Sequence, residues 1–225
     1  MSFYQQLQAA TEAQRNALLA IPFIREGAAG RLALSSYLAF LEQAYHHVKH
    51  TLPLLMACGA RLPQSHEWLR VAVAKYIEEE TGHQEWILND IAAAGGDAER
   101  VRAGRPELAT ELMVAYAYDT IQRGNPVGFF GMVLVLEGTS VVLASSAADR
   151  IQQSLGLPNA AFSYLRSHGS LDVSHIAHFQ SLMDRLESAA DRGAVIRRAR
   201  VFYRLYGDIF RALPLDRIGA AQEVA

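Results

Sequence analysis

The stretch VGFFGMVLVLEGTSVVLASSAA, residues 127–148, decides the fold class of this chain. It is the most apolar run of the sequence, and Glu137 at its centre is its only charged residue. The run is long enough to cross a membrane, but a carboxylate at the centre of such a span is costly in lipid. Because the chain has no second run of this kind, we interpret the stretch as a buried core helix.

The segments on both sides of this run also show helical periodicity, and no convincing strand alternation appears. Glycines, prolines and capping residues divide them into separate helices, with a kink expected at Pro53 and an interruption considered at Gly169. We expect helices over about residues 2–20, 35–59, 65–95, 107–124, 127–156, 160–186 and 191–211. The sequence therefore predicts an all-α bundle of about seven helices. We expect one domain over residues 1–215 and a short C-terminal tail over residues 216–225.

Composition narrows the classes of function. The formal net charge is −2, so no basic surplus points to a nucleic-acid partner. Cys58 is the only cysteine, which excludes an internal disulfide and favours a reducing compartment. The N-terminus lacks the basic and apolar regions of a secretory signal. We therefore expect a cytoplasmic protein with no membrane partner.

Glu80 and His83 are the first candidate functional pair. They are three residues apart, which places them side by side on one face of a helix. A Glu-x-x-His pair of this kind supplies ligands in carboxylate-bridged metal bundles. The alternative is a solvated acidic turn in which His83 pairs with Glu79.

Glu137 is the second candidate. A lone buried carboxylate is costly unless a cation compensates its charge. No Lys or Arg occurs between Pro126 and Asp149, so the partner must come from another part of the chain. A bound metal ion and a buried arginine of another helix both remain open.

His168, Asp172 and His175 form the third group, and on a continuous helix they lie within about 60° of one another. Three such donors can chelate one ion, or Asp172 can bridge two. Alternatively, Ser170 or Asp172 caps a helix after a break at Gly169, and the histidines lie at the surface. Taken together, the three groups give six oxygen and nitrogen donors, which suit one or two iron or manganese ions.

Three segments carry a resemblance to a known family: EEETGHQEW (residues 78–86), VLEGTS (135–140) and SHGSLDVSHIAHF (167–179). They resemble the ligand helices of the heme-oxygenase-like diiron oxidase superfamily. The likeness covers roughly residues 34–210 and is greatest to members described as iron-containing redox enzymes or TenA-like proteins.

The resemblance implies a seven-helix heme-oxygenase-like fold that holds two non-heme iron ions, with manganese also acceptable, and uses O₂ as co-substrate. It implies oxidation of a small amino- or carboxylic-acid substrate by desaturation, decarboxylation, C–C cleavage or N-oxygenation, and we expect a homodimer. The implied metal ligands are Glu80, His83, Glu137, His168, Asp172 and His175. Glu78 or Glu79 could replace Glu80, and Glu42 or His47 could add a further ligand.

Other functions of the same fold remain open. A TenA-like hydrolase would need a nucleophilic thiol. We expect Cys58, the only cysteine, to be a small buried apolar residue instead. A heme protein would need an axial histidine, for which His46, His47 and His50 are candidates. A non-catalytic ligand-binding or regulatory protein is the alternative from a different class. For a substrate pocket we consider four aromatic residues and one arginine, namely Phe129, Phe130, Tyr116, Tyr118 and Arg123.

Overall fold

The structure is a computed structural model that describes the backbone of residues 1–218 and the side chains of residues 1–167 and 175–218. Over residues 1–218 it is built from helices, and one isolated β-bridge joins Leu32 to Arg217. The α-helices are α1 (Phe3–Ala10), α2 (Glu12–Leu19), α3 (Pro22–Ala28), α4 (Leu34–Val48), α5 (Thr51–Arg61), α6 (Glu67–Glu80), α7 (His83–Ala93), α8 (Ala98–Ala103), α9 (Leu108–Arg123), α10 (Phe130–Leu155), α11 (Ser163–Asp184) and α12 (Ala189–Ala212). Short 3₁₀ turns are η1 (Gln64–His66), η2 (Pro126–Phe129) and η3 (Asn159–Ala161). The predicted all-α class is confirmed.

The helices are more numerous than the seven expected because several of them break. The first breaks at Thr11, whose hydroxyl donates to the Leu7 carbonyl at 2.8 Å. A hydrogen bond from a threonine hydroxyl to the carbonyl four residues earlier competes with the regular helical pattern and often bends a helix. The second expected helix breaks at residues 49–50, and Pro53 does not kink it. Pro53 lies in the first turn of α5, where its missing N–H costs nothing.

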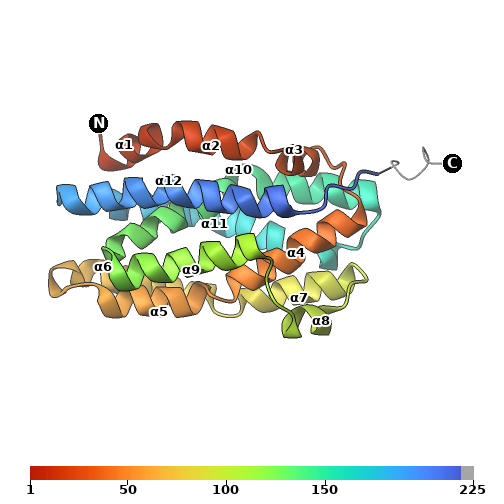
Figure 1. Cartoon of the computed structure of the whole chain (residues 1–225), viewed down its shortest axis with the longest axis horizontal. Helices are drawn as coiled ribbons and strands as arrows, with labels where there is room; N and C mark the ends of the chain where they lie inside the picture. The colour runs from red at the N-terminus through yellow and green to blue at the C-terminus, as the bar shows by residue number, and fades with distance from the viewer. Residues whose placement is uncertain (219–225) are drawn as a thin grey trace.

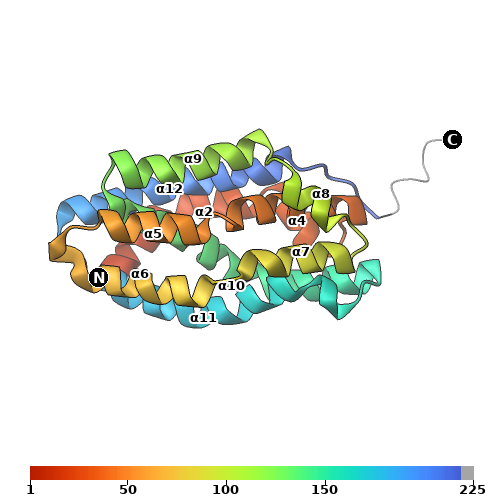
Figure 2. The same cartoon turned by 90° about the horizontal axis from the view of Figure 1, so that it is seen from below.

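Helix α10 is the central element of the bundle. It packs against α3, α11 and α12 (Figures 1 and 2). Gly131 lets α10 approach α12 closely, because a Cβ there would lie 2.5 Å from the Ala199 nitrogen. The segment Pro126–Leu155 is the one described helix long and apolar enough to cross a membrane, and half of its apolar window is buried inside the protein. Burial of this kind agrees with a core helix.

The long helices run nearly parallel to the longest axis of the molecule (Figure 1). Helices α1 and α2 lie along α12, and α6 runs beside α11 in the turned view (Figure 2). The chain after α12 returns to the start of α4, where the Ala33 N–H donates to the Asp216 carbonyl at 2.8 Å. This arrangement brings α4, α6, α10 and α11 around one interior.

One buried imidazole makes stability depend on pH. His46 is fully buried on α4, and its Nδ1 lies 3.1 Å from the Lys49 ammonium nitrogen. Burial, followed by the charge of Lys49, lowers the pKa of His46 to about 4. In the unfolded chain the imidazole binds a proton near pH 6.5, whereas in the folded protein it stays neutral until about pH 4. His46 therefore does not lower the free energy of unfolding above pH 6.5. The free energy of unfolding decreases as the pH falls from 6.5 toward 4.

We therefore expect the melting temperature to fall between pH 6.5 and pH 4, and to fall less in His46→Gln, which cannot bind the proton. Thermal unfolding of both proteins across this range, followed by circular dichroism, measures the difference. Equal slopes for the wild type and the variant would contradict the assignment to His46.

Candidate metal centre

Glu80 and His83 meet at the junction of two helices. Helix α6 ends at Glu80, Gly82 has a φ of +91°, and α7 begins at His83. The expectation that the pair lies on one continuous helix is therefore wrong. The two side chains still meet across this break, with His83 Nδ1 2.9 Å from Glu80 Oε2, and α7 continues onward from the end of α6 (Figure 2). Both are buried, and the Trp86 ring stacks on His83 with centroids 3.9 Å apart.

Glu137 and His175 form a second buried pair, between α10 and α11. His175 Nδ1 lies 3.6 Å from Glu137 Oε1, and His175 Nε2 lies 3.3 Å from Glu79 Oε2. The edge of the Tyr76 ring faces His175, with centroids 5.8 Å apart. The imidazole thus lies between two carboxylates from different helices, which an antiparallel bundle can bring together but a sequence cannot display.

The three neighbouring glutamates of α6 occupy different environments. Glu78 is exposed, so it faces away from the interior. Glu79 is one-third exposed and lies 3.4 Å from Lys75 as well as near His175. Glu80 is buried and lines the internal cavity. Sequence reasoning left this choice open, and the burial favours Glu80, with Glu79 as a partner of His175.

The remaining two predicted ligands cannot be placed. His168 and Asp172 belong to residues 168–174, whose side chains lie outside the described part of the structure. Helix α11 itself runs unbroken from Ser163 to Asp184, so the chain does not break at Gly169. Among the side chains that are described, no three His, Cys, Asp or Glu residues group closely enough to hold a metal ion.

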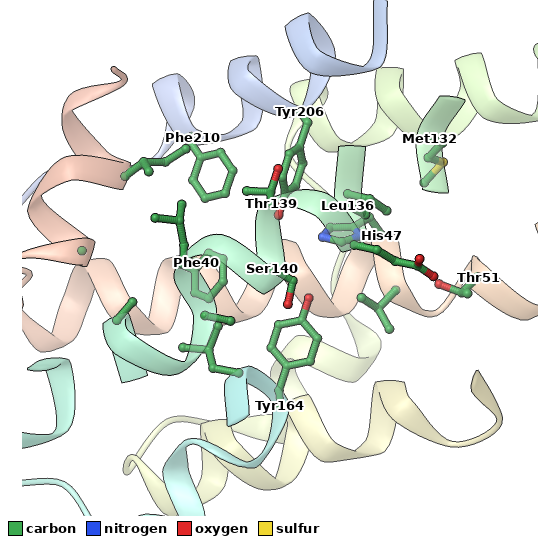
Figure 3. Close-up of a pocket in the computed structure, with 18 of the residues that line it drawn as sticks. Phe40, His47, Thr51, Met132, Leu136, Thr139, Ser140, Tyr164, Tyr206 and Phe210 are labelled. Atoms are coloured by element: carbon green, nitrogen blue, oxygen red, sulfur yellow. The ribbon is translucent and has the colours of Figure 1, made fainter. Parts of the chain in front are cut away.

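A cavity of about 180 Å³ adjoins these pairs. Glu80 and Glu137 both line it, together with Tyr76. Most of the lining is apolar, and seven further polar side chains from α4, α5, α10, α11 and α12 interrupt it: Tyr37, His47, Thr51, Thr139, Ser140, Tyr164 and Tyr206 (Figure 3 labels all of these but Tyr37). The two buried carboxylates therefore face the same mostly apolar space.

The donor set fits a divalent metal of the iron or manganese type. Carboxylate oxygens and imidazole nitrogens are the ligands that such ions accept. Glu80 and Glu137 are each less than a tenth exposed, and their described ion pairs are with His83 and His175 rather than with Lys or Arg. Carboxylates buried in this way need a compensating positive charge, which a bound cation would supply.

Several other candidates from the sequence lie away from the cavity. Arg123 is exposed and forms an ion pair with Asp119, so it is no substrate clamp. Glu42 pairs with Arg100 at 2.8 Å. His50 lies 3.1 Å from the hydroxyl of Tyr118. Of the four aromatic residues considered for a pocket, only Phe129 lines the cavity; the others are Phe130, Tyr116 and Tyr118.

The thiol of Cys58 is poorly suited to nucleophilic catalysis. Cys58 is fully buried and its Sγ lies 3.6 Å from the Pro126 carbonyl, which it faces as a donor. Burial raises the pKa of Cys58 to about 12, so almost no thiolate forms at neutral pH. The residue does not line the cavity. A hydrolase that depends on a cysteine nucleophile is therefore disfavoured.

Comparison with solved structures shows which fold this chain shares. A domain of unknown function from Shewanella denitrificans OS217 with a heme oxygenase-like fold superposes with a TM-score of 0.82 at 24% identity, over 92% of this chain and 90% of that one. A TenA homologue from P. horikoshii OT3 superposes with a TM-score of 0.78 at 11% identity, over 94% of this chain and 97% of that one. The heme oxygenase of Leptospira interrogans superposes with a TM-score of 0.75 at 16% identity, over 95% of this chain and 100% of that one.

These likenesses establish a heme oxygenase-like fold. No curated protein matches the chain in sequence. The model of the family described as "Iron-containing redox enzyme" matches residues 38–207, which is most of the chain and includes every predicted ligand. The protein therefore belongs to the iron-containing redox enzyme family.

Proposed function

We propose that the protein is a non-heme diiron oxidase that uses O₂ to oxidise a small organic molecule held in the cavity. The observation that carries this proposal is the position of Glu137. It is the one charged residue in the apolar centre of α10, it lies 3.6 Å from His175, and it lines the cavity. A carboxylate and an imidazole from different helices that meet at the wall of a substrate-sized space are what a metal-dependent oxidase requires.

In this proposal Glu80, His83, Glu137 and His175 would hold the metal. His168 and Asp172 complete the six ligands that the sequence pattern implies. The bound iron would supply the activation of O₂. Glu79 would orient His175 through the ring nitrogen that does not bind metal, as carboxylates next to metal-binding histidines do.

The chain's own contribution is to position the substrate and to exclude water. The cavity walls come from α3, α4, α5, α6, α10, α11 and α12, and most of them are apolar. Such an apolar space would fix which bond of the substrate faces Glu80 and Glu137, and a bound substrate would displace solvent from the reacting atoms. Among the described residues no lysine or arginine lines the cavity, so a carboxylate substrate would find its counter-charge at the metal.

Iron binding gives the first test. We expect the purified protein to take up about two Fe(II) per chain under anaerobic conditions, the second more weakly. Uptake is measured by anaerobic titration, and O₂ consumption by the loaded protein with an oxygen electrode. Glu137→Gln should lower both, whereas Glu111→Gln, at an exposed position of α9, should change neither. A stoichiometry of zero after anaerobic loading would overturn the proposal.

A further inference from the structure

The cavity extends well beyond the candidate metal centre, along one side of α10. Its lining includes Glu137, Ser140, Ala144, Ala147 and Ile151, which are spaced by three or four residues and therefore share a face of the helix. At 1.5 Å per residue, Ala147 lies about 15 Å along the helix axis from Glu137. The space is thus elongated. Because Phe129 and Met132 also line it, the carboxylates lie between its two ends, and Ile151 marks the end farther from Glu137.

The far end of the cavity is apolar; we call it the apolar arm. Its walls come from α3 and the following turn, from the second half of α10 and from the end of α12: Phe23, Ile24, Gly27, Leu32, Ala147, Ile151 and Phe210. Gly27 contributes no side chain, and a Cβ there would already lie 3.3 Å from Leu32 Cδ1. A larger side chain at Gly27 would therefore press on Leu32, which lines the same arm. An alkyl chain is the ligand group that gains most from such a surface.

A polar group stands between the arm and the carboxylates. The Ser140 hydroxyl oxygen is buried and has no hydrogen-bond partner among the described residues. Its neighbour Thr139 differs, because its hydroxyl donates to the Val135 carbonyl at 2.6 Å. The side chains of Ser140 and Tyr164 point toward one another across the cavity (Figure 3). A buried hydroxyl without a partner is costly, so a ligand that supplies one is favoured.

We propose that the cavity binds an uncharged amphiphile, with a hydroxyl, carbonyl or amide group at Ser140 and an alkyl chain in the apolar arm. This inference rests on the proposed function, in which that molecule is the substrate. The polar group would lie one helical turn, about 5 Å along the axis, from Glu137. The bonds next to the polar group would then be those nearest the candidate centre. The head group is uncharged because, among the described residues, no Lys or Arg lines the cavity to bind an anion, and the carboxylates of Glu80 and Glu137 are those that would hold the metal.

The head group is tested by calorimetric titration of the metal-free protein with 1-octanol and octanoate. We expect 1-octanol to bind most tightly. Ser140→Ala should weaken its binding about five-fold, the value of one neutral hydrogen bond. Ser145→Ala, at an exposed position of the same helix, is the matched control and should change nothing. Tighter binding of octanoate than of 1-octanol, or equal effects of the two serine variants, would overturn the proposal.

The tail is tested with the series from 1-butanol to 1-decanol. Each added methylene should raise the affinity about four-fold until the chain reaches the end of the arm. In Gly27→Leu this rise should stop at a shorter alcohol, and Ala147→Leu offers the same obstruction from α10 if the first variant folds poorly. Gly193→Leu, on the exposed side of α12, is the control. A rise that stops at the same alcohol in all four proteins would rule out the apolar arm as the site of the chain.

The two proposals fail in different ways because these titrations contain no iron. A protein that binds 1-octanol as described and takes up no Fe(II) would contradict the diiron oxidase alone. A protein that takes up Fe(II) and prefers octanoate in its metal-free form would contradict the uncharged amphiphile alone.

Discussion

His175→Ala should lose iron and O₂-dependent turnover while it keeps its helix content. His175 lies between Glu137 at 3.6 Å and Glu79 at 3.3 Å, so its removal deletes the group that joins α10 to α6. Even the loss of a residue that only supports a ligand lowers metal affinity about 10-fold or more, and loss of a ligand should cost at least as much. The apolar core of the bundle is untouched. Iron content by colorimetric assay and helix content by circular dichroism measure the two effects.

His178→Ala is the matched control for this experiment. His178 lies one turn further along α11 and also packs against Tyr76, with centroids 6.0 Å apart. It should retain its iron, since no described ion pair joins it to Glu79 or Glu137. A His175→Ala protein with full iron content and full turnover would remove His175 from the centre. Melting is compared in the metal-free state, because a metal that binds only the native state stabilises it by mass action.

Asp90→Ala should destabilise the whole protein. Asp90 is fully buried on α7, and it caps α11, which has no capping side chain of its own. Its Oδ1 accepts from the Ser163 N–H and its Oδ2 from the Tyr164 N–H, both at 2.9 Å, and the Ser163 hydroxyl also donates to Oδ1. Burial raises the pKa of Asp90 above its usual value, and the hydrogen bonds from these three donors offset only part of that rise.

Removal of the carboxylate leaves two partly buried N–H groups without this acceptor, and each such loss costs roughly 1–3 kcal/mol. We expect a loss of about 3 kcal/mol, which corresponds to a fall in melting temperature of about 10 °C for a chain of this size. Differential scanning calorimetry measures it. Because Tyr164 lines the cavity, we also expect weaker binding of 1-octanol.

Asp97→Ala provides the comparison. Asp97 caps the short helix α8 from an exposed position, by accepting from the Arg100 N–H at 2.9 Å. Loss of an exposed cap of this kind costs about 1 kcal/mol. If Asp90→Ala cost no more than Asp97→Ala, the capping of α11 from α7 would not be important for stability. Asp90→Asn, which keeps one oxygen acceptor, should fall between the two.

The sequence alone determined the all-α class and the central position of α10. Both follow from local properties, since apolar periodicity sets the helices and a long apolar run must be buried. It also identified Glu80, His83, Glu137 and His175 as candidates, because charged and imidazole groups among apolar neighbours require a partner. The homodimer and the cytoplasmic location remain predictions.

Helix boundaries were less predictable. The break at Gly82 could not be located, because an isolated glycine in a helical pattern is tolerated as often as it ends a helix. Only the structure shows that its φ of +91° divides α6 from α7 and still brings Glu80 to His83. Pro53 was expected to kink a helix, and the tertiary structure instead places it in the first turn of α5.

The partners of each candidate were decided only by the tertiary structure. Nothing in the local pattern connects His175 to Glu79, or Asp90 to Ser163, because these pairs are separated by long stretches of chain. The cavity is likewise a product of packing, since its walls come from helices at both ends of the sequence. Periodicity reports which face of a helix is buried, but the helix that covers that face depends on the packing of the whole bundle.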